Sequence, residues 1–157
     1  MTDDVLVPPG VPILEAAAWV GHACWGEIAL HRVLTGWLAD EDDGEAVVAF
    51  WAARAHAAER AEAWHRRLPE LREFPRAGFV RGSEEGEGGA AALAALAGPG
   101  RAGERRAALD AALARMAAHY EDHLAVAVGP ADGPTAETLR RSLASVAADR
   151  GGSASRP

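Results

Sequence analysis

The sequence has no lysine and only one cysteine, and no apolar run in it is long enough to cross a bilayer. Because Cys24 has no second cysteine to pair with, an internal disulfide is excluded, and we expect a reducing, cytoplasmic setting. The first ten residues, MTDDVLVPPG, are acidic where a signal peptide would be basic. The net charge of −7 argues against non-specific binding to nucleic acid, which depends on a basic surface. We therefore expect neither a membrane nor a nucleic acid as a partner.

Aromatic residues are also scarce, at 6%, and alanine dominates the apolar residues of this 157-residue chain. A chain of this length can bury one sizeable core. Amphipathic segments separated by Gly and Pro predict an all-α protein, with helices over residues 11–39, 45–68, 104–128 and from 133 onward. Short turns join the first two helices and the last two, and residues 74–103 form a long crossover. We expect one four-helix bundle over residues 1–150 and a disordered tail over 151–157.

The apolar stripe of the helix expected over residues 45–68 has titratable residues at its C-terminal end. Steps of three and four residues give the stripe Val48, Trp51, Ala55, Ala58, Glu62 and His65. A carboxylate removed from water costs several kcal/mol unless it is paired or bound to a cation. Glu62 therefore needs a partner, and Glu62 and His65 are spaced so that both can face one ion.

Two of the other helices carry comparable stripes. The first helix has Ile13, Ala17, Val20, Cys24, Glu27, His31, Leu34 and Leu38 on one face, with Glu27 near the middle. The third helix has Leu109, Leu113, Met116, Tyr120, His123 and Ala127, with His119 immediately beside them. The fourth helix is short and offers Leu139, Leu143 and Val146. We expect Glu27, His31, Glu62, His65 and His123 to be buried and to converge between the helices.

Glu27 and the pair Glu62-x-x-His65 form half of a known ligand pattern. With these residues, in WGEIALHRVL and AERAEAWHRRL, the chain resembles the ferritin-like superfamily of di-iron and di-manganese carboxylate proteins. The resemblance implies a ferritin-like bundle of two antiparallel hairpins in which Glu27, Glu62 and His65 bind iron or manganese. It also implies a metal-dependent oxidase or hydroxylase of a small molecule, with Tyr120 as a nearby redox or hydrogen-bonding group.

The second half of the chain departs from that pattern. A complete dinuclear site needs another Glu and a second Glu-x-x-His, but the fourth helix has Glu137 followed three residues later by Arg140. The nearest substitutes lie on the third helix: His119, Tyr120, Glu121 and His123. A mononuclear site or a lost site is therefore as compatible with the sequence as a dinuclear centre.

Two other kinds of metal site use histidines at helical spacing. His119 and His123 share a helix face, and with His65 they are similar to the three-His site of DinB-like bundles. A hemerythrin-like site lacks its His-x-x-x-Glu element, because Arg60 follows His56 at that spacing.

The axial register of the first hairpin gives a separate expectation for Glu27. With a rise of about 1.5 Å per residue and a turn centred near residue 42, Glu27 lies level with about residue 57, roughly 7 Å short of Glu62. A longer first helix would reduce this offset. Otherwise Glu27 lies nearer to His56 and Glu59, which we expect on a solvated face.

The alternative to a metalloprotein is a non-catalytic bundle that forms a homodimer or binds a partner through its Trp-rich first helix pair. In such a bundle Glu62 pairs with Arg66, and the tryptophans fill gaps that alanines leave. Cys24 is then a small buried apolar residue. The metal content of the purified protein separates the two interpretations.

Overall fold

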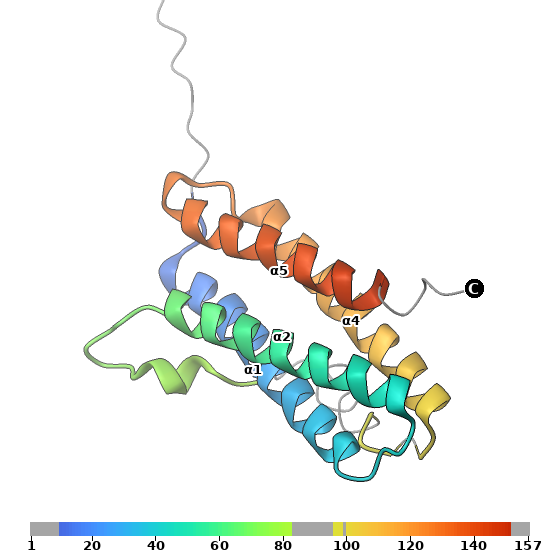
Figure 1. The fold of residues 1–157 in the computed structure, drawn as a ribbon. Coiled ribbons are helices and arrows are strands. Elements are labelled where there is room, and N and C mark those ends of the chain that lie inside the picture. Colours follow the sequence, from blue (N-terminus) through green and yellow to red (C-terminus); the bar gives the residue numbers. More distant parts are fainter. Residues whose placement is uncertain (1–9, 83–95, 99, 152–157) are drawn as a thin grey trace, which may run out of the picture.

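The computed structural model describes residues 10–82, 96–98 and 100–151, and this part of the chain is helical and contains no strand (Figure 1). The four long helices are α1 (Ile13–Leu38), α2 (Gly44–Arg67), α4 (Ala102–Val126) and α5 (Gly133–Gly151). Two short 3₁₀ helices, η1 (Arg76–Phe79) and η2 (Pro130–Asp132), lie in the connections. The prediction of an all-α chain is confirmed. Residues 152–157 of the predicted tail and residues 83–95 and 99 of the predicted crossover lie outside the described residues, whereas Gly151 belongs to α5.

The α1–α2 hairpin is closed by an acidic cap. Asp43 has extended backbone angles, and its carboxylate accepts a hydrogen bond from the backbone N–H of Ala46 at 2.7 Å. This bond satisfies one of the free N–H groups at the start of α2 and fixes where the helix begins. At the other end Leu68 is extended and precedes Pro69, which cannot continue the hydrogen-bond ladder. The two helices therefore run antiparallel as neighbours.

The connection between α4 and α5 is tied to the start of α1. The carboxylate of Asp132 accepts hydrogen bonds from the backbone N–H groups of Gly129, at 2.9 Å, and Val11, at 3.4 Å. A Cβ atom on Gly129 would lie 2.3 Å from Cα of Gly10, so glycine is required for this close approach. These contacts hold both hairpins together at one end of the bundle.

The core lies between the two hairpins, where α2 packs against α1 and α5, and α4 packs against α5 and α1. Phe79 and Val80 of the segment after α2 pack against this core. Their backbone comes so close to α1 that a Cβ atom on Gly21 would lie 1.9 Å from the carbonyl oxygen of Phe79. None of the described helices is long and apolar enough to span a membrane.

The predicted stripes of α1 and α4 are confirmed in large part, but the stripe predicted for α2 is wrong. Val48 and Trp51, predicted to face the core, are 69% and 60% exposed. The buried face of α2 instead carries Ala46, Phe50, Ala53, Ala57, Arg60, Ala61 and Trp64. This face is displaced by about one residue, or about 100°, from the predicted one. Alanine lines both faces, so the tertiary contacts of Phe50, Arg60 and Trp64 decide which face is buried.

Candidate functional site

A buried carboxylate lies at the centre of the bundle. Glu27, in the middle of α1, is 0% exposed. Arg60 of α2 approaches it with two parallel hydrogen bonds, from Nε to Oε1 at 2.7 Å and from Nη2 to Oε2 at 3.0 Å. The hydroxyl of Tyr120, on α4, donates to Oε1 at 2.5 Å. Three helices therefore meet through one carboxylate, and the cation that faces it is a guanidinium.

Arg60 also connects this carboxylate to α5. Its Nη1 donates to Oγ of Ser145 at 2.9 Å and to Oδ2 of Asp149 at 3.0 Å. The other oxygen of Asp149 lies 2.6 Å from Nδ1 of His56, which is partly exposed. We call this set (Glu27, Arg60, Tyr120, Ser145, Asp149 and His56) the ion network. It runs from the centre of the bundle to its surface.

The electrostatics of the ion network favour a charged Glu27 and a neutral Tyr120. Burial raises the pKa of the Glu27 carboxyl, while the charge and hydrogen bonds of Arg60 and the hydrogen bond of Tyr120 oppose that rise. Both carboxylate oxygens accept hydrogen bonds from the guanidinium of Arg60, and such charge-assisted bonds favour the charged form of Glu27. Burial and the neighbouring Glu27 charge raise the pKa of Tyr120 well above its ordinary value. Tyr120 therefore acts as a hydrogen-bond donor.

The predicted metal ligands Glu27, Glu62 and His65 are not brought together. Glu62 and His65 lie on the exposed face of α2. Glu62 forms an ion pair with Arg66 one turn further along the helix, the pairing expected for a non-catalytic bundle. The expectation that both residues converge on Glu27 is wrong, because α2 is rotated so that Arg60 takes the inward position.

Arg60 was missed as a partner for Glu27, although two signals in the sequence indicate it. The axial register places Glu27 level with about residue 57, and Arg60 lies within one turn of that point. Arg60 also continues a stripe with Phe50 and Trp64, the largest apolar side chains buried on α2.

Within the described residues, no group of three or more His, Cys, Asp or Glu side chains is placed to hold a metal ion.

A second polar site lies between α1 and α4, where two histidines of α4 stack on one tryptophan and a histidine of α1 lies against one of them. The imidazoles of His119 and His123 stack on the indole of Trp19, with ring centroids 5.0 and 4.9 Å apart. The ring of His22, on α1, meets His119 edge-on at 4.9 Å and 73°. We call His22, His119 and His123 the histidine cluster. His22 takes the place that the three-His prediction gave to His65.

One ring nitrogen of each imidazole in the histidine cluster lacks a hydrogen-bond partner among the described residues. His22 Nδ1, His119 Nε2 and His123 Nδ1 are buried atoms to which no hydrogen bond is made. Burial lowers the pKa of all three imidazoles, and for His119, where His22 and His123 add to the effect, the pKa falls to about 4. All three rings are therefore neutral at pH 7, and each neutral ring has one nitrogen with a free lone pair.

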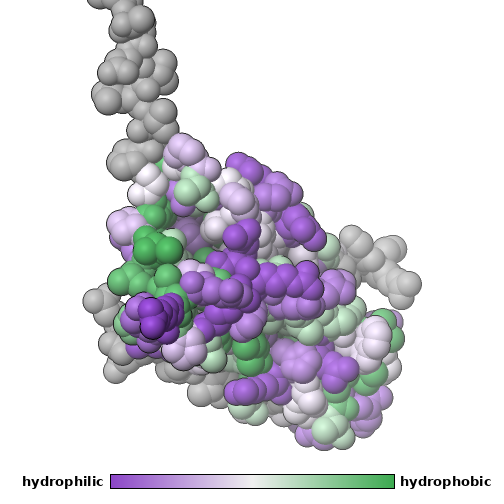
Figure 2. All heavy atoms as spheres, turned by 90° about the vertical axis from the view of Figure 1, so that its left-hand side faces the viewer, coloured by the Kyte–Doolittle hydropathy of each residue, from purple (hydrophilic) through white to green (hydrophobic). Residues whose placement is uncertain are grey.

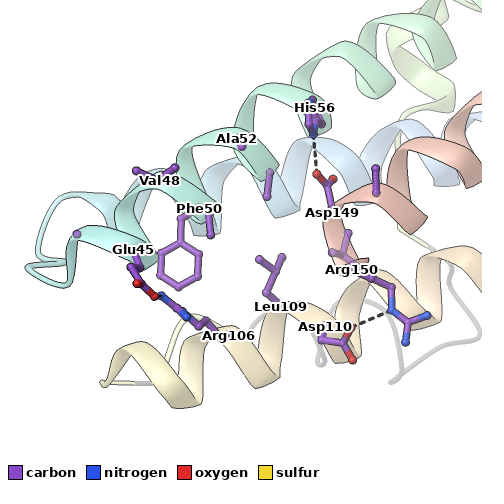
Figure 3. A pocket seen from close by; sticks show the side chains of 15 residues that line it. Glu45, Val48, Phe50, Ala52, His56, Arg106, Leu109, Asp110, Asp149 and Arg150 are labelled. Carbon is purple, nitrogen blue, oxygen red and sulfur yellow. Dashed lines mark hydrogen bonds and ion pairs between the residues drawn. The ribbon is translucent and has the colours of Figure 1, made fainter. Parts of the chain in front are cut away.

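A groove opens between α2, α4 and α5 at the C-terminal end of α5 (Figure 3). Its volume is about 780 Å³, and Phe50 and Leu109 point into it from opposite helices. The groove is also lined by two ion pairs, one between His56 and Asp149 and one between Arg150 and Asp110. One end of the ion network thus reaches this groove, which we call the α5-end groove.

Comparisons with protein-family models, with curated proteins and with solved structures gave no match.

Proposed function

We propose that this protein is a non-catalytic, ferritin-like helical bundle that forms a homodimer through the α5-end groove. The observation that carries this proposal is the exposure of Val48 and Trp51 on α2, at 69% and 60%. Val48 lines the groove, and Trp51 lies three residues further along the same helix. Large apolar side chains left in water at a hollow surface are typical of a protein interface.

The groove and its surroundings suit a second copy of the same chain. Val48 and Trp51 project from each copy, while the small side chains of Ala49, Ala52 and Ala148 leave space in the groove. In a two-fold dimer the same patch faces itself, so the projecting residues of one copy can enter the groove of the other.

The charges around the groove also permit a two-fold arrangement. Glu45 and Asp110 supply negative charge at the groove, and Arg106 and Arg150 supply positive charge. Arg150 pairs with Asp110, and Arg106 lies 3.9 Å from Glu45, within one chain, so two copies can meet here without facing unbalanced like charges.

The ion network supports a structural role for the polar centre. In ferritin-like metalloproteins the inward carboxylates face metal ions. Here the guanidinium of Arg60 faces Glu27, and Tyr120 donates to the same carboxylate. The two antiparallel hairpins and their long connection support the ferritin-like connectivity. A metal-dependent oxidase or hydroxylase stays a prediction, which metal analysis of the purified protein tests.

Dimerisation is tested by sedimentation velocity over a dilution series. The wild-type chain should sediment as a dimer at high concentration, and Val48→Glu and Trp51→Glu should each shift it to the monomer. Leu14→Glu is the matched control, because Leu14 is 55% exposed and lies near the start of α1, at the opposite end of the bundle. Figure 2 shows that end, where apolar side chains gather beside a larger polar area.

Two results would overturn the proposed dimer. One is a wild-type chain that is monomeric at every concentration. The other is a dimer that Leu14→Glu dissociates as strongly as Trp51→Glu does, because the interface would then lie elsewhere. Iron or manganese bound at one equivalent per chain and lost in Glu27→Gln would favour the metalloenzyme instead.

A further inference from the structure

We propose that His22 and His119 bind one divalent transition-metal ion of the kind that prefers imidazole nitrogen, such as Cu²⁺ or Zn²⁺. This site is separate from the ion network and does not depend on the proposed dimer. It joins α1 of the first hairpin to α4 of the second.

The spacing of the two rings fits a shared ion. Their centroids are 4.9 Å apart, and their planes are inclined at 73°. An ion held at the usual metal–nitrogen distance of about 2.0–2.1 Å places the centroids of two imidazole ligands about 5 Å apart. The two rings are therefore close enough to share one ion after a change of side-chain torsion.

The atoms that would bind the ion have no other partner among the described residues. His22 Nδ1 and His119 Nε2 are both buried and accept no hydrogen bond. The backbone of Arg81 lies beside the ring of His22 and raises its pKa, against the larger lowering by burial.

Both imidazoles are in the protonation state that a metal requires. Burial lowers the pKa of His22 and of His119, the latter to about 4. Protons therefore compete little with a metal ion for these nitrogens at pH 7.

Two imidazoles leave the remaining coordination positions to water or to an external ligand. His123 is not needed as a third ligand, since its ring stacks on Trp19 and Trp64. Among the divalent ions that imidazole suits, Cu²⁺ binds most tightly to a given nitrogen site. Cu²⁺ is therefore the most sensitive probe.

The test titrates metal-free protein with Cu²⁺ in a calorimeter and records the electron paramagnetic resonance spectrum. The wild-type chain should bind one Cu²⁺ with hyperfine structure from two imidazole nitrogens. His22→Ala and His119→Ala should each weaken binding by at least about tenfold, because each removes a ligand. His119→Phe should do the same while keeping a ring against Trp19, so a loss of binding in this variant is not a loss of packing.

His65→Ala is the matched control, because His65 is an exposed histidine on α2. It should leave the affinity and the spectrum unchanged. The proposed site is wrong if His22→Ala and His119→Phe bind Cu²⁺ as tightly as the wild-type chain does. It is also wrong if His65→Ala weakens binding as much as they do, since the ion would then be held by surface histidines.

Discussion

Two polar sites lie in the interior of this bundle, and they differ in how their polar atoms are satisfied. In the ion network, Arg60 donates through Nε, Nη1 and Nη2 to Glu27, Ser145 and Asp149. In the histidine cluster, one ring nitrogen of each imidazole is buried without a hydrogen bond among the described residues. A buried charge with complete pairing fixes the positions of the helices around it, whereas unpartnered buried nitrogens cost stability and mark a place for a ligand.

Replacement of Arg60, the cation at the centre of the ion network, should lower the unfolding free energy most. Arg60→Met leaves Glu27 and Asp149 as buried carboxylates without their partner, and we expect a loss of about 3–5 kcal/mol of unfolding free energy, measured by urea denaturation. Arg60→Lys should lose less, because it keeps the charge but not the two parallel hydrogen bonds. Arg115→Met, at an exposed position on α4, is the control and should be nearly neutral. A loss below 1 kcal/mol in Arg60→Met would show that the ion network does not hold the bundle together.

Removal of one hydrogen-bond donor from the ion network should lower the unfolding free energy by a smaller amount. Tyr120→Phe deletes the hydroxyl that donates to Glu27 but keeps the ring beside Trp64. We expect a loss of about 1.5–3 kcal/mol, the range for hydrogen bonds to charged groups. A double-mutant cycle with Glu27→Gln isolates the coupling between the two side chains. If the two single losses simply add, the hydroxyl does not stabilise the carboxylate.

Removal of an unpartnered nitrogen from the histidine cluster should instead raise the unfolding free energy. In the metal-free protein, His119→Phe removes a buried nitrogen that has no partner and keeps a ring against Trp19. We expect a gain of about 1 kcal/mol in unfolding free energy, because an unsatisfied buried polar atom is replaced by carbon. A loss as large as that in Tyr120→Phe would mean that the histidine cluster is satisfied by contacts of its own, and the contrast with the ion network would fail.

The surface ion pair between Glu62 and Arg66 should have the smallest effect. Both side chains are mostly exposed, at 64% and 72%, so water already solvates their charges. We expect Glu62→Ala to change the unfolding free energy by less than about 0.5 kcal/mol. A loss of several kcal/mol would place Glu62 in the interior after all, as the metal-ligand prediction required.

The positions of the helices could be predicted because their signals are local. The start of α2 near Gly44, its end before Pro69 and the start of α5 near Gly133 depend on neighbouring residues, and they lie within one residue of the bounds that the sequence predicts. The buried position of Glu27 was also predictable, because α1 has one clear apolar stripe and Glu27 lies within it.

The sequence by itself determined the all-α class, the course of α1 and α4, and the presence of a buried carboxylate that needs a partner. Only the tertiary structure decided which partner it has. Alanines line several faces of α2 and distinguish weakly between them, so local periodicity could not set its rotation. Arg60 turns inward because Glu27 on α1 and Asp149 on α5 both stabilise its charge there. These contacts join residues far apart in the chain, and their free energy exists only once the helices have packed.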